Sequence, residues 1–340
     1  MDLNFYDDAN IRDQRHETKL ESNNNKSQAK LCITGTSGAI GSSVLRHLLD
    51  TLHYPPSNLI ISSSNPSSIP VSITSKGVIV RYGNYLDPST LATAFIGATK
   101  LLIVSFPSME DESRFAAHRN AIDAAKAAGV QHLYYTSLAF NGQPTQSPVM
   151  FAHGKTEQYL KEKDMTYTIL REGLYNEHFP LYCGFFDPQK VVANIAGARE
   201  VVTTTVGGVA YAAIDDLGEA TARIVAHSGP EYDNRMCLLS GPVAVRPAEL
   251  AAMISTVLSL DPPLVIKLVD ASTFFDHNVA QGRQYLYGID PATFLKGSIE
   301  TGKAITNGEA SVTGTLLEEV LGRKPKDAET TIREILSGVK

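Results

Sequence analysis

The chain of 340 residues lacks any long apolar stretch. Its uncharged apolar runs span only a handful of residues, as at 101–104, whereas a membrane-spanning helix needs about 20. The N-terminus does not combine positive charge with an apolar run, as a secretory signal peptide would. We therefore expect no membrane insertion and a location in the cytoplasm.

Cysteines and grouped metal ligands are also scarce. The chain has three cysteines, Cys32, Cys183 and Cys237, which lie far apart and form no Cys-x-x-Cys pair. Its nine histidines form no His-x-x-x-His pattern. Neither a disulfide framework nor a bound metal is therefore expected.

Basic charge is not in excess. Lys and Arg number 30 against 36 Asp and Glu, which gives a net charge of −6, and no basic run occurs. The electrostatic footprint of a nucleic-acid-binding protein is thus missing. We expect a small-molecule substrate as partner, and the oligomeric state stays open between monomer and homodimer.

The first 29 residues form a polar segment with charges of both signs around Ser22-Asn23-Asn24-Asn25. A segment of this composition buries too little apolar surface to fold alone. We predict a disordered tail at 1–29, and the alternative is a helix that orders on a partner.

Short apolar runs alternate with helical patterns from Lys30 onward. Continuous apolar runs predict strands that are buried on both faces of a parallel sheet, and intervening helices predict a doubly wound Rossmann α/β fold. We assign residues 30–171 to this nucleotide-binding domain. Its predicted strands contain residues 31–34, 58–61, 78–80, 101–104, 132–135 and 167–170, and helices are predicted at 112–128 and 155–162.

Residues 172–340 are less regular and predict a smaller C-terminal lobe that holds the substrate. We expect the segment at about 205–228 to return to the Rossmann core. It contains a predicted helix at 216–227 with Asp215 as its N-cap. Further helices are predicted at 247–258, 313–321 and 328–336, and a strand at 264–269.

The most informative motif is Gly35-Thr36-Ser37-Gly38-Ala39-Ile40-Gly41, which lies between the first predicted strand and a helix. In a dinucleotide-binding turn, the first glycine allows the tight turn and the second lets the backbone approach the pyrophosphate. The third allows close packing, and the helix N-terminus offers free N–H groups to the phosphates. We predict that all seven residues bind the cofactor, the alternative being a structural turn without a ligand.

The end of the second predicted strand bears on which cofactor binds. A carboxylate there binds the ribose of NAD, and a basic residue accommodates the extra phosphate of NADP. The segment Ser62-Ser63-Ser64-Asn65-Pro66 has neither. Because no carboxylate repels a phosphate, we favour NADP(H) over NAD(H), with Ser63 and Ser64 in contact and Lys76 and Arg81, further along the chain, as the candidate cations.

Several further motifs give the chain a family resemblance over most of residues 30–325. It resembles the NmrA-like proteins of the short-chain dehydrogenase/reductase superfamily, and among them the bacterial type-two NAD(P)H:quinone oxidoreductases. The motifs are Gly35–Gly41, Gly83-Asn84-Tyr85-Leu86-Asp87, His118-Arg119-Asn120, Ala124-Ala125-Lys126-Ala127-Ala128-Gly129-Val130, Tyr135-Thr136-Ser137-Leu138, Tyr167-Thr168-Ile169-Leu170-Arg171-Glu172-Gly173 and Leu321-Gly322-Arg323-Lys324-Pro325.

The resemblance implies a Rossmann domain, a smaller lobe and a cleft between them. Family members reduce quinones, enones, imines or related compounds with NAD(P)H, or bind the dinucleotide as regulators. Two positions depart from the family pattern: Ser64 stands where an arginine is usual, and Asn84 where an aspartate contacts the adenine. Asn84 is retained as a predicted cofactor contact, as are Ser105 and Phe106 at the inner ribose.

The catalytic residues also depart from the superfamily, which uses a serine and Tyr-x-x-x-Lys. Here the matching segment is Phe151-Ala152-His153-Gly154-Lys155, and a phenyl ring cannot transfer a proton. We predict that Lys155 binds the nicotinamide ribose and that Ser137 and Tyr175 face the substrate. The alternatives are a solvated lysine, a strand-end cap and a packed tyrosine. His153 could donate a proton, but an exposed helix histidine is the favoured interpretation.

The sequence thus predicts an NAD(P)H-dependent oxidoreductase. Its hydride would pass to a small, planar, electron-poor quinone, enone or imine, for which solvent can supply any proton. Likeness to fungal sequences suggests a role in secondary metabolism. A regulator that senses the dinucleotide without turnover is the alternative, and an epimerase or dehydratase is disfavoured because it usually needs the tyrosine.

Overall fold

The computed structural model describes residues 30–140, 145–182, 195, 197–198, 200–280 and 290–337. The predicted tail at 1–29 and Cys183 lie outside these residues.

Seven parallel strands form the central sheet, in the order β3-β2-β1-β4-β5-β6-β8. This order confirms the predicted Rossmann fold. The first strand, β1, lies inside the sheet, and the strand order reverses between β1 and β4. Ligands bind at such a point, at the carboxyl ends of the strands. The strands are β1 (Leu31–Thr34), β2 (Leu59–Ser63), β3 (Ile79–Tyr82), β4 (Lys100–Ile103), β5 (His132–Leu138), β6 (Thr166–Glu172) and β8 (Arg235–Leu239).

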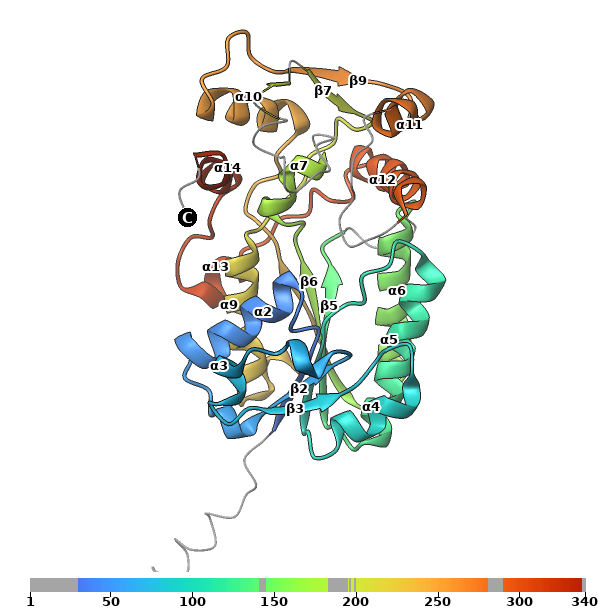
Figure 1. Ribbon diagram of the computed structural model, residues 1–340, viewed down its shortest axis with the longest axis vertical. Helices are drawn as coiled ribbons and strands as arrows, with labels where there is room; N and C mark the ends of the chain where they lie inside the picture. Colours follow the sequence, from blue (N-terminus) through green and yellow to red (C-terminus); the bar gives the residue numbers. More distant parts are fainter. Residues whose placement is uncertain are drawn as a thin grey trace, which may run out of the picture.

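Helices cover both faces of the sheet (Figure 1). Helices α2 (Ala39–Arg46), α9 (Ile214–Ala226) and α13 (Leu316–Leu321) pack on one face, and α4 (Pro88–Phe95), α5 (Asp111–Ala127) and α6 (Pro148–Lys161) lie on the other. Short helical segments complete this domain: η1 (His47–Thr51), η2 (Pro56–Asn58), η3 (Pro66–Ser68), α3 (Val71–Thr74) and η5 (Pro230–Tyr232).

The strands form because their side chains are apolar on both sides. Leu31 and Ile33 of β1 join the core under α2 and α9, whereas Cys32 joins the core under α4 and α5. All three side chains are fully buried. Alternate residues thus enter two separate cores, as expected of a central strand in a doubly covered sheet.

Helix α9 returns from the C-terminal half of the chain to pack against α2. The prediction that Asp215 caps this helix is wrong, because the helix begins earlier and its N-cap is Ala213. Asp215 instead lies in the first turn and accepts a hydrogen bond from Nε2 of His47 at 3.0 Å. Sequence patterning also missed β8, an edge strand whose Arg235 and Met236 are exposed.

The smaller lobe lies above the carboxyl ends of the strands (Figure 1). It contains a two-stranded parallel sheet and several helices, and its apolar core includes Leu250, Ile254 and Ile332. Its elements are η4 (Asn176–His178), α7 (Phe179–Tyr182), β7 (Glu200–Thr203), α10 (Pro247–Val257), β9 (Val265–Leu268), α11 (Ala271–Ala280), α12 (Pro291–Thr306) and α14 (Ala328–Ser337).

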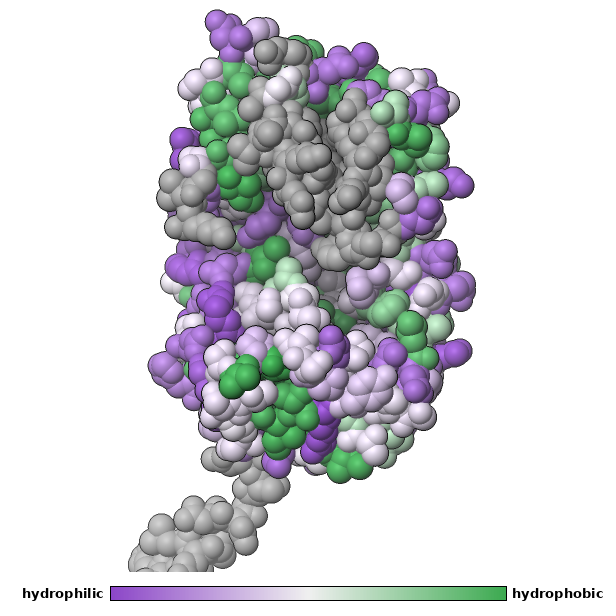
Figure 2. Space-filling model, viewed as in Figure 1, coloured by the Kyte–Doolittle hydropathy of each residue, from purple (hydrophilic) through white to green (hydrophobic). Residues whose placement is uncertain are grey.

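Polar and apolar side chains are interspersed on the face shown in Figure 2. No helix among the described residues has the length and apolar composition needed to cross a bilayer. Within the same residues, His, Cys, Asp and Glu form no group that could hold a metal ion.

Candidate active site

A cleft of about 670 Å³ lies at the carboxyl ends of β1, β4, β5 and β6, between the sheet and the smaller lobe. Residues of the glycine turn line it. So do apolar side chains from both lobes, which we call the apolar chamber: Leu138, Phe140, Val149, Leu174, Leu181, Tyr182, Phe274, Phe294 and Ile305.

The glycine turn has the geometry of a phosphate site. Gly35 has a φ of +65°, which disfavours any residue with a side chain. A Cβ at Gly41 would lie 2.2 Å from the carbonyl oxygen of Gly35, so the helix and the turn touch backbone to backbone. Gly38 is the N-cap of α2 and provides no side-chain cap, which leaves the first N–H groups of the helix open to a ligand.

One buried polar atom in the turn supports this fit. Oγ1 of Thr36 is buried without a hydrogen-bond partner among the described residues. Such atoms are rare in folded proteins and call for an explanation. The open amides and this hydroxyl together fit a dinucleotide phosphate. Ser37, Ala39 and Ile40 line the cleft beside them.

The residues predicted to contact the adenine and its ribose are Ser63, Ser64 and Asn84, and their described hydrogen bonds are local. Ser63 ends β2 and its Oγ accepts from the backbone N–H of Asn65 at 3.1 Å, and Ser64 is exposed. The Oδ1 of Asn84 accepts from the N–H of Leu86 at 3.0 Å, within its own turn.

Neither of the two cations considered for this end points to the turn after β2. Lys76 pairs with Asp50 at 2.9 Å, and Arg81 donates to the carbonyl of Ala94 at 3.1 Å. A basic contact to a 2′-phosphate is therefore not provided by either side chain as placed.

Ser105 lies in the cleft wall after β4, as predicted. Its Oγ accepts from the guanidinium of Arg114 at 2.7 Å. The ring of Phe106 packs edge-on against Tyr85, with 6.2 Å between centroids, and its backbone N–H points to His118. Among the described residues, Phe106 is not part of the cleft lining, so its predicted contact with the cofactor is not supported, although its backbone N–H holds His118.

The structure places Lys155 outside the cleft. Its Nζ lies 3.2 Å from a carboxylate oxygen of Asp111, also bonds to Glu112, and lies 4.7 Å from the ring centroid of Phe151. The hydrogen bond that Lys155 donates to Glu112 raises the pKa of Lys155. The predicted role of Lys155 in the ribose site is therefore not supported.

The residues of α6 that line the cleft are Val149 and His153. They are four residues apart and share one helix face, whereas Phe151 and Lys155 lie about 200° further round. His153 is only 3 % exposed, so the prediction of an exposed histidine is wrong. Burial, aided by the nearby cation of Arg114, lowers the pKa of His153 well below its usual value.

A buried polar network holds His153. The Oη of Tyr135 lies 2.7 Å from Nδ1 of His153 and 3.2 Å from Nδ1 of His118. Nδ1 of His118 is also 2.9 Å from Oγ1 of Thr156. The backbone N–H of Phe106 donates to Nε2 of His118 at 2.9 Å. Tyr135 and His118 are both fully buried, so this buried network fixes the orientation of the His153 imidazole.

Ser137 faces the cleft but its hydroxyl proton is already used. Its Oγ donates to Oε1 of Glu157 at 2.7 Å, and that buried carboxylate also pairs with Arg171 at 2.7 Å. Ser137 can therefore accept a hydrogen bond from a ligand while it donates to Glu157. Because the bond to Glu157 fixes its hydroxyl, Ser137 can position a ligand but does not supply a proton.

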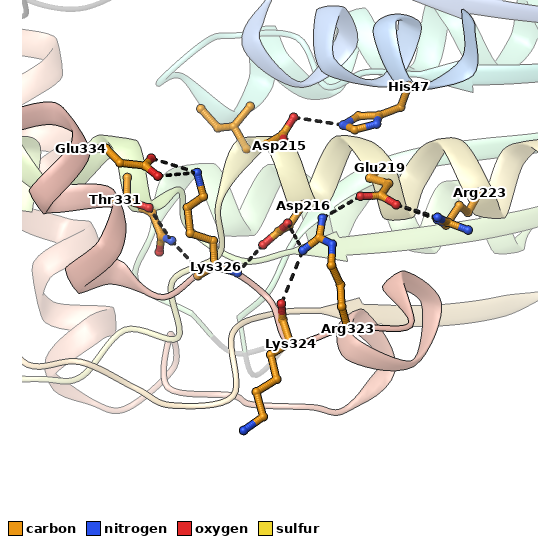
Figure 3. A network of polar contacts seen from close by, with 12 residues as sticks. His47, Asp215, Asp216, Glu219, Arg223, Arg323, Lys324, Lys326, Thr331 and Glu334 are labelled. Atoms are coloured by element: carbon orange, nitrogen blue, oxygen red, sulfur yellow. Dashed lines mark hydrogen bonds and ion pairs between the residues drawn. The ribbon is translucent and has the colours of Figure 1, made fainter. Parts of the chain in front are cut away.

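Tyr175 lines the cleft as predicted, and its ring packs against His178 with 5.0 Å between centroids. The neighbouring Asn176 fixes this wall, since its Nδ2 donates to the carbonyl of Lys326 at 3.0 Å. Figure 3 shows how Lys326 belongs to a network in which Arg323 also pairs with the buried Asp216 at 2.8 Å. The C-terminal segment thus anchors the cleft wall to α9.

Glu172 was not among the predicted site residues, although it lines the cleft at the end of β6. It is 2 % exposed and accepts from Oγ1 of Thr221 at 3.1 Å. Burial raises its pKa to about 8. A carboxyl group whose raised pKa favours the protonated form therefore borders the cleft.

Sequence patterning also missed His153, Arg114 and Tyr135 as site residues. Two signals could have found the first two: His153 follows Val149 at helical spacing, and Arg114 precedes the family motif at His118 by one helical turn. The threonines that line the cleft from the smaller lobe, at 203–205 and Thr301, carry no recognisable motif.

Comparison with known proteins shows the family to which the chain belongs. The chain matches the NAD(P)H-binding family over residues 35–180. It is 30% identical over 308 residues to the NmrA-like family domain-containing oxidoreductase flvB of Aspergillus flavus, which covers 89% of this chain and 94% of that protein. It is 32% identical over 224 residues to quinone oxidoreductase 2 of Escherichia coli, covering 65% and 72% respectively.

A solved structure shows the same architecture. Citrobacter sp. triphenylmethane reductase complexed with NADP(H) superposes with a TM-score of 0.76 at 26% identity, over 90% of this chain and 99% of that one. These three relatives are thus described as oxidoreductases or reductases, and the solved one binds NADP(H). The chain belongs to the NmrA-like family, an NAD(P)H-binding, atypical branch of the short-chain dehydrogenase/reductase superfamily.

Proposed function

We propose that the protein is an NAD(P)H-dependent reductase of small, planar, electron-poor acceptors: quinones, enones or imines. The observation that carries this proposal is one cleft that is lined both by a glycine turn suited to a phosphate and by the apolar chamber. A bound cofactor would supply the hydride, and the chain would bind both partners, orient them and exclude water. A role in secondary metabolism stays a prediction.

A panel assay tests this function. Protein is mixed with NADPH and with quinones, enones and imines in turn, and the absorbance of the reduced cofactor is followed. We expect oxidation of NADPH with at least one acceptor class. Tight cofactor binding without oxidation by any of them would favour the regulatory alternative. The supporting observation is that α6 lacks the superfamily tyrosine, since Phe151 stands at the matched position and Val149 at the cleft-facing one.

We further propose NADP(H) as the preferred cofactor. The supporting observation is the absence of a carboxylate at the end of β2, where Ser63, Ser64 and Asn65 offer hydroxyl and amide groups instead. Since neither Lys76 nor Arg81 points there, the expected preference is modest, about two- to tenfold in dissociation constant. Calorimetric titration with NADPH and NADH measures it, and tighter binding of NADH would contradict it.

A further inference from the structure

The hydrogen-bond directions in the buried network of His118, Tyr135 and His153 can be assigned from one backbone amide, because an amide N–H has a fixed role. The N–H of Phe106 can only donate, so Nε2 of His118 must accept. The Oγ of Ser105, at 3.3 Å from the same nitrogen, can donate to it as well. A neutral imidazole carries one proton, and burial lowers the pKa of His118 so that it stays neutral. The proton of His118 is therefore on Nδ1.

The proton on Nδ1 of His118 points to Thr156 and Tyr135. Oγ1 of Thr156 donates to the carbonyl of Ala152 at 2.8 Å, so toward His118 it acts as an acceptor. Oη of Tyr135 also lies within reach as an acceptor. The hydroxyl proton of Tyr135 is thereby left for another partner.

That partner is His153. Its Nδ1 lies 2.7 Å from Oη of Tyr135, the shortest contact of this hydroxyl. An imidazole nitrogen with a lone pair is the strongest acceptor near it, so Tyr135 donates and Nδ1 of His153 accepts. The proton of neutral His153 is then on Nε2, which makes no hydrogen bond to another described residue. Because His153 lines the cleft, this N–H can donate to a ligand there.

We propose that Nε2–H of His153 donates a hydrogen bond to the carbonyl oxygen of the substrate, which makes His153 the catalytic residue that replaces the missing tyrosine. This rests on the proposed function. The donor stands on the cleft face of α6, the face that also carries Val149 of the apolar chamber. It suits the carbonyl oxygen of quinones and enones. A neutral imine nitrogen can accept the same bond, whereas an iminium nitrogen has no lone pair to accept it.

The proposed reduction needs no proton from the protein. A carbon of the acceptor takes a hydride, with its electron pair, from the reduced nicotinamide, which is left oxidised. The π electrons of the conjugated carbonyl move to its oxygen, and the N–H of His153 stabilises the negative charge that develops there. The resulting anion takes its proton from water.

The first test reads the tautomer and needs no turnover. In ¹⁵N spectra of protein labelled at its histidine rings, the His153 signals are assigned by their loss in His153→Gln. We expect Nδ1 without a proton and Nε2 with one, and a shift of the Nε2 signal when menadione is added with NADP⁺. Tyr135→Phe is expected to perturb both signals. A proton on Nδ1, or an Nε2 signal indifferent to menadione, would overturn the proposal.

The second test is kinetic and uses menadione with NADPH. His153→Leu is expected to lower kcat/KM by about 10²–10³-fold, with the dissociation constant for NADPH unchanged. His153→Gln, whose amide can donate, should recover part of the loss. The control is Gln158→Leu, an exposed change on the same helix that should leave kcat/KM as in the wild type.

The outcomes separate the two proposals. A wild type that reduces neither menadione nor any other acceptor would refute the proposed reductase, while the tautomer experiment still decides the role of His153. A wild type that is active and a His153→Leu variant of equal kcat/KM would refute the donor alone. If His153→Leu does not fold, the glutamine variant and Tyr135→Phe carry the same comparison.

Discussion

Gly38→Ala is expected to weaken NADPH binding by about 10- to 100-fold without lowering the melting temperature. The nearest protein atom to an added Cβ is the carbonyl oxygen of Gly35 at 3.4 Å, an ordinary contact, and the φ of −86° suits alanine. The fold therefore accepts the change. The exposed side of Gly38, however, is where a phosphate must approach the first amides of α2, and loss of one or two charge-assisted hydrogen bonds accounts for the expected factor.

Gly41→Ala should behave differently, although the motif is the same. The added Cβ would lie 2.2 Å from the carbonyl oxygen and 2.6 Å from the carbonyl carbon of Gly35. Both are backbone atoms, so no side chain can rotate away, and the turn or α2 must shift. We expect a loss of about 1–3 kcal/mol or more in the free energy of unfolding, together with loss of NADPH binding.

Thermal unfolding and calorimetric titration of the two variants decide between a binding turn and a purely structural one. The matched control is Ser42→Ala, an exposed change on α2 that should alter neither quantity. A Gly38→Ala protein that binds NADPH as tightly as the wild type would show that no ligand approaches this turn. The assignment of the cleft as a dinucleotide site would then fail.

The glycine turn and the strands could be predicted from the sequence because their causes are local. Continuous apolar runs such as the one at β1 must be buried on both faces, and a turn of positive φ at Gly35 needs glycine whatever surrounds it. Both features depend on only a few neighbouring residues. The order of strands then follows from right-handed crossovers between parallel neighbours.

The catalytic face of α6 could not be predicted in the same way. Matching Lys155 to the superfamily motif fixes a position along the chain, but the direction of each side chain depends on where the helix packs. Phe151 and Lys155 each follow a cleft-facing residue by two positions, so they lie on the outer face of the helix, where Lys155 contacts Asp111 and Phe115. Both faces of α6 carry a titratable residue, so composition could not separate His153 from Lys155.

The remaining site residues depend on contacts between distant segments. Asn176 meets Lys326 across 150 positions of sequence, and Thr221 of α9 reaches Glu172 of β6 across 49. No local pattern encodes such pairs. Asp215 illustrates the same limit: its sequence position suits a helix cap, but His47 on η1 offers it a partner that only the packed fold provides.

Glu172→Gln is expected to make the stability of the cofactor-free protein much less dependent on pH. In the folded state, burial raises the pKa of Glu172 from the ordinary 4.5 to about 8. The stability associated with the protonated carboxyl is fully present below pH 4.5 and is lost as the pH rises through 8. Glutamine can still accept the hydrogen bond from Thr221 but takes up no proton, so it avoids this loss.

Urea unfolding at about pH 5.5 and about pH 8.5 measures the effect. Over this interval the wild type should lose roughly 3 kcal/mol of unfolding free energy relative to Glu172→Gln, because one pKa unit corresponds to about 1.4 kcal/mol. Glu318→Gln, an exposed change on α13, should retain the wild-type dependence. Parallel curves for the wild type and Glu172→Gln would mean that Glu172 is ionised in the folded protein, and the cleft would then carry a fixed negative charge. A cleft of that kind would repel the anion formed when a quinone accepts hydride, so this measurement also bears on which acceptors the chamber can reduce.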